Sequence, residues 1–185
     1  MAWALVDLLI HKQEVTYMNN RVDRPVIIIE KSALDMVLEI GAGAATVANI
    51  GMVVWFWSEL PPTIPIHFGL GGHANLFGPK ITILIMPAVA LFSYILMTLV
   101  GRHPHTWNYP VPITPENAER QYKIGMQVLI WMKAEMLLTL VFVVWQIIWV
   151  ALGKAETINV AALFALSGVI FGTSWYHLRQ AKLAR

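Results

Sequence analysis

Four long runs without any Asp, Glu, Lys or Arg constrain this chain more than any other feature of its sequence. They cover residues 40–57, 81–100, 136–152 and 157–176. A helix needs about 20 mainly apolar residues to cross a hydrocarbon core about 30 Å thick, and every run is close to that length. The sequence therefore predicts an all-α membrane protein with four transmembrane helices. We place these spans at residues 38–58, 81–100, 132–152 and 157–176.

The composition supports a membrane protein and excludes several kinds of site. The chain of 185 residues is 57% hydrophobic and 13% charged, whereas proteins on average contain about 25% charged residues. It contains no Cys, which excludes disulfides, thiolate metal sites and Cys nucleophiles. The net charge is only +2, so the chain is expected to contact membrane lipid and no nucleic acid.

The basic residues are distributed unevenly around the four runs. Ten of them lie before the first run, between the second and third, or after the fourth: Lys12, Arg21, Arg24, Lys31, Arg102, Arg120, Lys123, Arg179, Lys182 and Arg185. The other two loops contain only Lys80 and Lys154. Because Lys and Arg favour the cytoplasmic side, we expect a multi-pass protein of the cell membrane with both termini in the cytoplasm. The loop over residues 59–80 then faces outward.

The rest of the chain divides around these spans. Residues 1–31 are predicted to form a cytoplasmic segment, 32–176 the membrane domain and 177–185 a cytoplasmic tail. The first ten residues, MAWALVDLLI, are too short to span a bilayer. They suggest an interfacial helix or a translated extension, with Met18 as an alternative start. Ser32 followed by Asp35 is a weak capping box and predicts the start of the first helix.

The predicted inner loop, residues 101–124, contains a helix start. Thr114 is suited to cap a helix, Pro115 fits a first turn, and Glu116 favours the positive end of the helix dipole. We expect one helix from about Pro115 to Leu152, and a bend or break at Gly125 is left open.

Polar residues inside or beside the spans are candidates for function. They are Glu39, Asn49, Lys133 and Glu135. Asn49 is expected to make an interhelical hydrogen bond, with a ligand contact as the alternative. Lys133 and Glu135 lie near the inner boundary, where a Lys side chain can extend toward water. Since they are two residues apart, they point to different helix faces and should not form one ion pair.

Small residues in the first and fourth spans predict close helix packing. The first span contains several Gly and Ala residues, and the fourth has two pairs at four-residue steps on one face: Ala161 with Ala165 and Gly168 with Gly172. Such faces let membrane helices approach closely. The sequence leaves open whether they pack within the chain or in a homo-oligomer.

The loop over residues 59–80, ELPPTIPIHFGLGGHANLFGPK, is rich in Pro and Gly between two apolar spans. IPIHF suits a short extended segment, GLGGHAN supplies residues for a tight turn, and LFGPK returns the chain to the second span. We expect a small ordered cap. His67, His73 and Glu59 do not have the spacing of a standard metal site. We therefore predict no metal, cofactor or catalytic residue.

The loop resembles a known signature, L-P-x-x-I-P-x-H-F-x-x-x-G-x-x-x-x-x-G-x-K. The matching positions are Leu60, Pro61, Ile64, Pro65, His67, Phe68, Gly72, Gly78 and Lys80. In these positions the chain is similar to bacterial and archaeal membrane proteins with the domain of unknown function 1648, a group that includes the immunity protein against the sporulation-delaying toxin. The resemblance extends over most of residues 24–152. It implies residence in a membrane and an outer loop motif.

Three functional hypotheses follow. The first is a non-enzymatic accessory, sensor or immunity-type protein whose outer loop recognises a protein or peptide. The second is a small transporter or channel component, which would need polar residues such as Glu39, Asn49 and Gln146 to converge on one pathway. The third is a membrane enzyme that uses His67.

Overall fold

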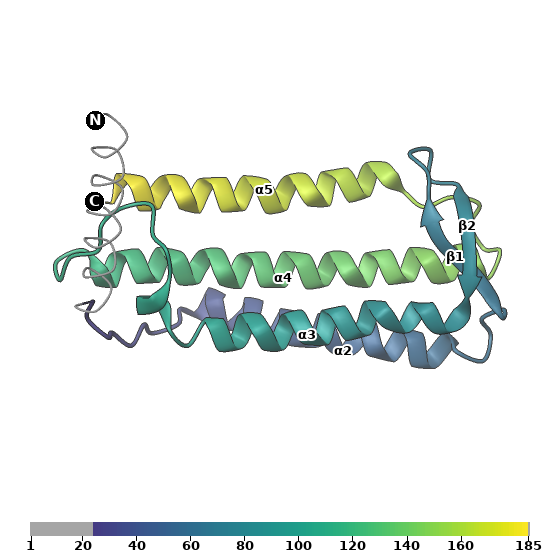
Figure 1. The fold of residues 1–185 in the computed structure, drawn as a ribbon, viewed down its shortest axis with the longest axis horizontal. Coiled ribbons are helices and arrows are strands. Elements are labelled where there is room, and N and C mark those ends of the chain that lie inside the picture. The colour runs from purple at the N-terminus through teal and green to yellow at the C-terminus, as the bar shows by residue number, and fades with distance from the viewer. Residues whose placement is uncertain (1–23, 185) are drawn as a thin grey trace, which may run out of the picture.

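The computed structural model describes residues 24–184 as a bundle of long helices with a β-hairpin at one end (Figure 1). Within these residues, four helical segments are long and apolar enough to cross a membrane. The helices are α2 (Ala33–Phe56), α3 (Ile85–Val100), α4 (Ala118–Ala151) and α5 (Val160–Leu183). The predicted four-helix membrane architecture is confirmed. The expectations for the first ten residues and for Met18 lie outside the described residues.

The two ends of the bundle differ in what they contain. The hairpin end carries β1 (Thr63–Phe68), β2 (Ala74–Pro79), the short helix η1 (Lys80–Leu84) and the link between α4 and α5. The opposite end, here called the termini end, carries residues 24–32, the loop with helix η2 (Pro104–Thr106), and the last turn of α5. Figure 1 shows these two groups at opposite ends of the long axis.

Helix α2 begins with the predicted capping box. The Ser32 hydroxyl accepts from the Asp35 amide at 3.1 Å, and the Asp35 carboxylate accepts from the Ser32 amide at 2.9 Å. Two amides that have no partner within the helix are satisfied in this way, and the start of the helix is fixed.

Helix α4 begins three residues later than the sequence suggested. Thr114 is not its N-cap; Asn117 occupies that position, and residues 115–117 form a turn. The reason is local, because the Asn117 side chain accepts from the Thr114 amide at 2.9 Å and donates to the Pro112 carbonyl at 3.0 Å. These bonds hold the backbone in a turn before the helix starts.

Helix α4 is continuous through Gly125 and ends at Ala151, so there is neither a break nor a separate inner helix. Gly125 instead allows close contact with the preceding loop. A Cβ at this position would lie 3.1 Å from a Tyr109 ring carbon and 3.3 Å from Trp107. A glycine at position 125 therefore lets the rings of Tyr109 and Trp107 pack closely against the surface of α4.

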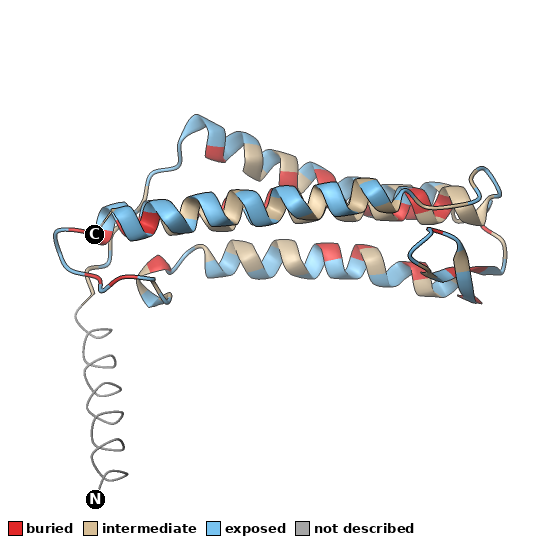
Figure 2. Cartoon of the chain, turned by 90° about the horizontal axis from the view of Figure 1, so that it is seen from above, coloured by how far each residue is buried: buried red, intermediate tan, exposed pale blue. Residues whose placement is uncertain are grey.

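Small residues pack α2 and α3 against α4. Ala42 and Ala45 of α2 are buried in one cluster with Ala90 of α3 and with Ala134 and Leu137 of α4. This part of the small-residue prediction is confirmed. The small face of α5 is different: a Cβ at Gly168 or Gly172 would meet no atom within 4 Å. Figure 2 shows α5 largely exposed or half-buried along its length.

Candidate functional site

The loop motif forms an antiparallel hairpin. Thr63 pairs with Pro79 and Ile64 with Gly78, and the register shifts between Pro65 and Phe68. The turn contains Gly72 at φ 81°, a backbone conformation that other residues adopt only at a cost. The extended segment and the tight turn expected from the sequence are both present.

The inward side of the hairpin is anchored on the helix ends. Leu60 and Ile64 are buried together with Val53, Ile83, Val144 and Ile148. Gly78 lies in β2, where a Cβ would come within 2.9 Å of the Ile66 side chain. Pro65 is buried as well, whereas Pro61 and Phe68 are half-buried. These motif residues hold the hairpin in place by packing.

Lys80, the last motif residue, binds the end of α2. Its ammonium group donates to the Trp57 carbonyl at 3.2 Å and lies 4.9 Å from the centre of the Trp57 ring. The last carbonyls of a helix lack partners within the helix, and a cation stabilises that end. Lys80 therefore joins the return strand to the helix that precedes the hairpin.

The tip of the hairpin is docked on the link between α4 and α5. His73 forms a β-bridge with Thr157, and the Ile158 amide donates to the Gly72 carbonyl at 2.9 Å. A Cβ on Gly72 would lie only 2.4 Å from the Ile158 carbonyl oxygen. Only a glycine permits this approach, so Gly72 fixes the hairpin to the second half of the bundle.

His67 has a partner inside the hairpin. Its Nδ1 lies 2.6 Å from the Asn75 side-chain oxygen, and both side chains are exposed. An anchoring role within the loop agrees with this bond. Among residues 24–184 no three His, Asp or Glu side chains are grouped closely enough to hold a metal ion.

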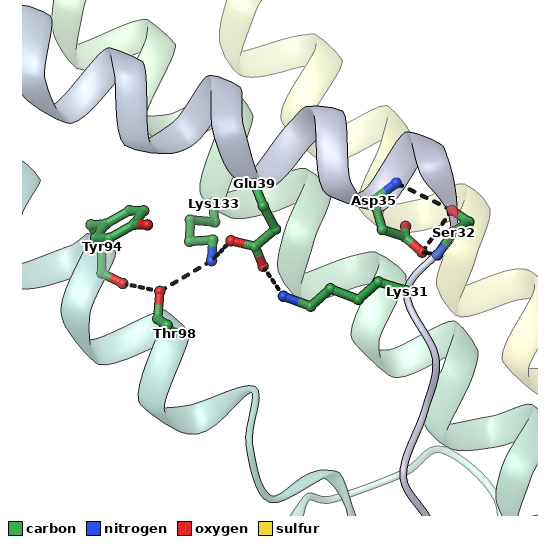
Figure 3. Close-up of polar contacts among 7 residues, drawn as sticks. All are labelled: Lys31, Ser32, Asp35, Glu39, Tyr94, Thr98 and Lys133. Carbon is green, nitrogen blue, oxygen red and sulfur yellow. Dashed lines mark hydrogen bonds and ion pairs between the residues drawn. The ribbon is translucent and has the colours of Figure 1, made fainter.

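Lys133 and Glu39 form a second polar site, inside the helices near the termini end. The Lys133 ammonium group lies 2.5 Å from a Glu39 carboxylate oxygen and 3.2 Å from the Thr98 hydroxyl (Figure 3). It is also 5.3 Å from the centre of the Tyr94 ring. Lys133 is only 1% exposed. It does not extend toward water as expected, because these partners from α2 and α3 satisfy its charge between the helices.

Glu39 binds two cations at once. Its other carboxylate oxygen accepts from Lys31 at 3.1 Å, and the Lys31 side chain is 42% exposed. The three groups together carry one net positive charge. Lys31, Tyr94 and Thr98 were not singled out from the sequence, and Lys133 is 94 positions from Glu39 along the chain.

The remaining polar candidates lie apart from this pair. Glu135 faces α5, where it accepts a hydrogen bond from the Thr173 hydroxyl at 2.9 Å. This agrees with the prediction that Glu135 and Lys133 do not form an ion pair. Asn49 is fully buried, but neither its side-chain oxygen nor its nitrogen has a hydrogen-bond partner among residues 24–184. The interhelical hydrogen bond predicted for Asn49 is not formed among these residues.

Comparison with known proteins finds a family match for the hairpin and for the adjoining parts of the helices that flank it. Residues 44–91 match the family described as "Domain of unknown function (DUF1648)". The chain carries a DUF1648 domain. This DUF1648 segment contains the second half of α2, the whole hairpin, η1 and the start of α3. It ends before Thr98 and begins after Glu39, so the ion pair at the termini end lies outside it.

A relative of this chain is an uncharacterized protein of Archaeoglobus fulgidus. The two are 37% identical over 62 residues, which is 29% of this chain and 34% of the relative. The match thus spans about a third of the curated relative. No solved structure matches.

A cavity of about 440 Å³, lined in part by Glu39, opens at the termini end of the bundle. Its walls come from the extended segment before α2, the ends of α2 and α3, the loop that follows α3, and α4. They are lined by Val26, Ile27, Ile28, Ile29, Lys31, Glu39, Met97, Thr98, Gly101, Arg102, Pro104, His105, Met126, Leu129 and Ile130. This cavity could not be predicted from the sequence, because its lining residues come from five separate parts of the fold.

Proposed function

We propose that this protein is a non-enzymatic accessory protein of the cell membrane, of sensor or immunity type, whose hairpin recognises an extended peptide or protein segment. One observation carries this proposal. The hairpin is anchored on the helices by its buried residues, and it leaves several large apolar side chains uncovered. Leu70 is 89% exposed at the tip, and Leu76 and Phe77 of β2 are 55% and 56% exposed.

The anchoring explains why such a surface suits recognition. Leu60 and Ile64 are buried against the helices, Lys80 binds the end of α2, and Gly72 is bonded to the α4–α5 link. A preordered surface loses little conformational freedom when a partner binds. The hairpin has only two strands, and the outward edge of a strand can pair with an added peptide strand.

The polar residues of the bundle support recognition over transport. Glu39 lines the cavity at the termini end, whereas Gln146 lines a different cavity at the hairpin end. Asn49 lies buried in α2 between the two. In the described part of the chain, these three side chains do not line one common pathway.

The position of the bases supports an outward hairpin. Seven described bases belong to segments at the termini end: Arg24, Lys31, Arg102, Arg120, Lys123, Arg179 and Lys182. Lys80 and Lys154 lie at the hairpin end. With Lys and Arg on the cytoplasmic side, both termini are cytoplasmic and the hairpin is exposed to the exterior.

The test is a selection of phage-displayed peptides on the full chain in lipid nanodiscs. Peptides that recognise the hairpin should bind at least about tenfold more weakly to a Leu70→Ser/Leu76→Ser variant, because burying each leucine contributes about 1.5–3 kcal/mol. Leu183→Ser is the matched control, since Leu183 is 71% exposed at the termini end. Selected peptides that bind the double variant and the wild type equally well would refute the proposal.

A further inference from the structure

The cavity at the termini end combines charged side chains with apolar walls. Its polar lining includes Lys31, Glu39, Thr98, Arg102 and His105, and the other lining residues are almost all aliphatic or Met. It lies where α2 begins and α3 ends, at one edge of the apolar helices. A lipid headgroup occupies this level of a membrane protein.

The charge around the cavity favours an anion. Glu39 is the one acid among the described lining residues, and Lys133 and Lys31 bind its two oxygens. The carboxylate is therefore more than neutralised. Arg102 adds a further positive charge to the lining, and Arg24 lies close by, with hydrogen bonds to the carbonyls of His105 and Trp107 at 3.3 and 2.7 Å.

The apolar part of the lining favours an amphiphile over a soluble anion. Val26 is 76% exposed and Ile28 is 92% exposed, although both belong to an extended segment outside the helices. Their neighbours Ile27 and Ile29 pack toward the Ile113 cluster. The segment thus holds one row of side chains inward and leaves a second apolar row uncovered beside the basic residues.

We propose that this cavity binds an anionic phospholipid, with its phosphate against Lys31 and Arg102 and its acyl chains beside Val26 and Ile28. Basic pockets between transmembrane helices recognise anionic headgroups by this chemistry. Glu39 orients Lys31, because its carboxylate binds the ammonium groups of both Lys133 and Lys31 (Figure 3). The inference is independent of what the hairpin recognises.

The experiment measures thermal unfolding of the full chain in a neutral detergent. Dioctanoyl phosphatidylglycerol should raise the melting temperature saturably, and dioctanoyl phosphatidylcholine should not. Arg102→Gln should weaken the apparent affinity for phosphatidylglycerol about tenfold, because a hydrogen bond to a charged group contributes at least that factor. Arg102→Lys should retain most of it. Arg102 is exposed, so these variants leave the packing intact.

Arg179→Gln is the control, because it removes the same charge from an exposed position of α5 that does not line the cavity. It should respond to phosphatidylglycerol like the wild type. Equal responses to the two lipids, or an Arg102→Gln variant with unchanged affinity, would overturn the site. If glycerol 3-phosphate stabilises the protein as well as phosphatidylglycerol does, the cavity binds a soluble phosphate and the lipid assignment is wrong.

Discussion

The hairpin end and the termini end of the same bundle are stabilised by different kinds of contact. At the hairpin end, Leu60 and Ile64 are packed on the helices and Gly72 bonds a neighbouring backbone. At the termini end, Lys133 is buried with Glu39 as its counter-ion. The first set depends on shape and close approach, and the second on charge that must stay paired. A substitution at the hairpin end should therefore destabilise the protein through lost packing, and one at the termini end through an unpaired charge.

The family match falls on one side of this division. Residues 44–91 include the whole hairpin, whereas Glu39 and Lys133 lie outside them. The hairpin is the part that this chain shares with the DUF1648 family. Glu39 and Thr98 lie on the parts of α2 and α3 outside the shared segment, and Lys133 lies on α4, which is wholly outside it.

The largest expected difference between the two ends is their accessibility in living cells. We expect a Cys at position 74 in the hairpin to react with an impermeant maleimide in intact cells, and a Cys at position 184 to react only after lysis. The chain has no Cys of its own, so each variant reports a single position. Labelling of position 184 but not of position 74 in intact cells would show that the predicted orientation in the membrane is wrong.

Removal of the Glu39 carboxylate, the counter-ion of the buried Lys133, should give the largest change in stability. Glu39→Ala leaves Lys133 without its carboxylate, and removing one partner of a buried pair costs about 3–5 kcal/mol. The free energy of unfolding, measured by SDS titration in mixed micelles, should fall by that amount. The Glu39→Leu/Lys133→Met double variant should be close to the wild type, because it removes both charges.

Lys31→Met is the matched control for this pair. This variant removes the second cation that binds Glu39. The Lys31 side chain is 42% exposed, and exposed ion pairs contribute only about 0–1 kcal/mol to the free energy of unfolding. A Glu39→Ala variant no less stable than Lys31→Met would show that Lys133 does not depend on Glu39.

At the hairpin end, Gly72→Ala should give the next largest effect. The added methyl would meet the Ile158 carbonyl at 2.4 Å, and the residue would keep φ at 81°. We expect a loss of about 2–3 kcal/mol, in the range known for strained backbone conformations. Gly153→Ala separates the two causes, because Gly153 has φ 68° with no atom near its Cβ. It should lose only about 1–2 kcal/mol; equal losses would mean that tip docking contributes nothing.

The smallest effect is expected at His67. His67→Ala removes the bond to Asn75 and should lower the free energy of unfolding by about 0.5–1 kcal/mol. Asn75→Ala should lower it by a similar amount, and the double variant should lose little more, because both remove one bond. Zinc should leave the melting temperature of the wild type unchanged. A zinc-dependent rise that disappears in His67→Ala and in His73→Ala would restore a metal site.

What could be predicted from the sequence was mostly local. Runs without charge gave the helices, Ser32 with Asp35 gave the start of α2, and the alternation in IPIHF gave β1. Thr114 was mistaken for the cap of α4 because the preference of a residue type does not reveal that the Asn117 side chain closes a competing turn.

The ion pair could not be predicted because it depends on the rotation of three helices about their axes. The sequence made Glu39 and Lys133 candidates, but it could not show that Thr98 and Tyr94 would face them from α3. Asn49 failed for the same reason. A polar residue in a span predicts a partner, yet the facing positions of the neighbouring helices decide whether one exists.

The continuity of α4 has a mechanical consequence. Val144 and Ile148 of α4 pack in one cluster with Leu60 and Ile64 of the hairpin end, and Lys133 lies near the middle of the same helix, where it contacts Glu39. No proline interrupts the residues between them, so we expect this part of α4 to move as one rigid unit. If a partner that binds the hairpin rotates α4, Lys133 turns through the same angle. The ammonium group of Lys133 then shifts relative to the Glu39 carboxylate, so the contact between two charges changes at a distance from the bound partner.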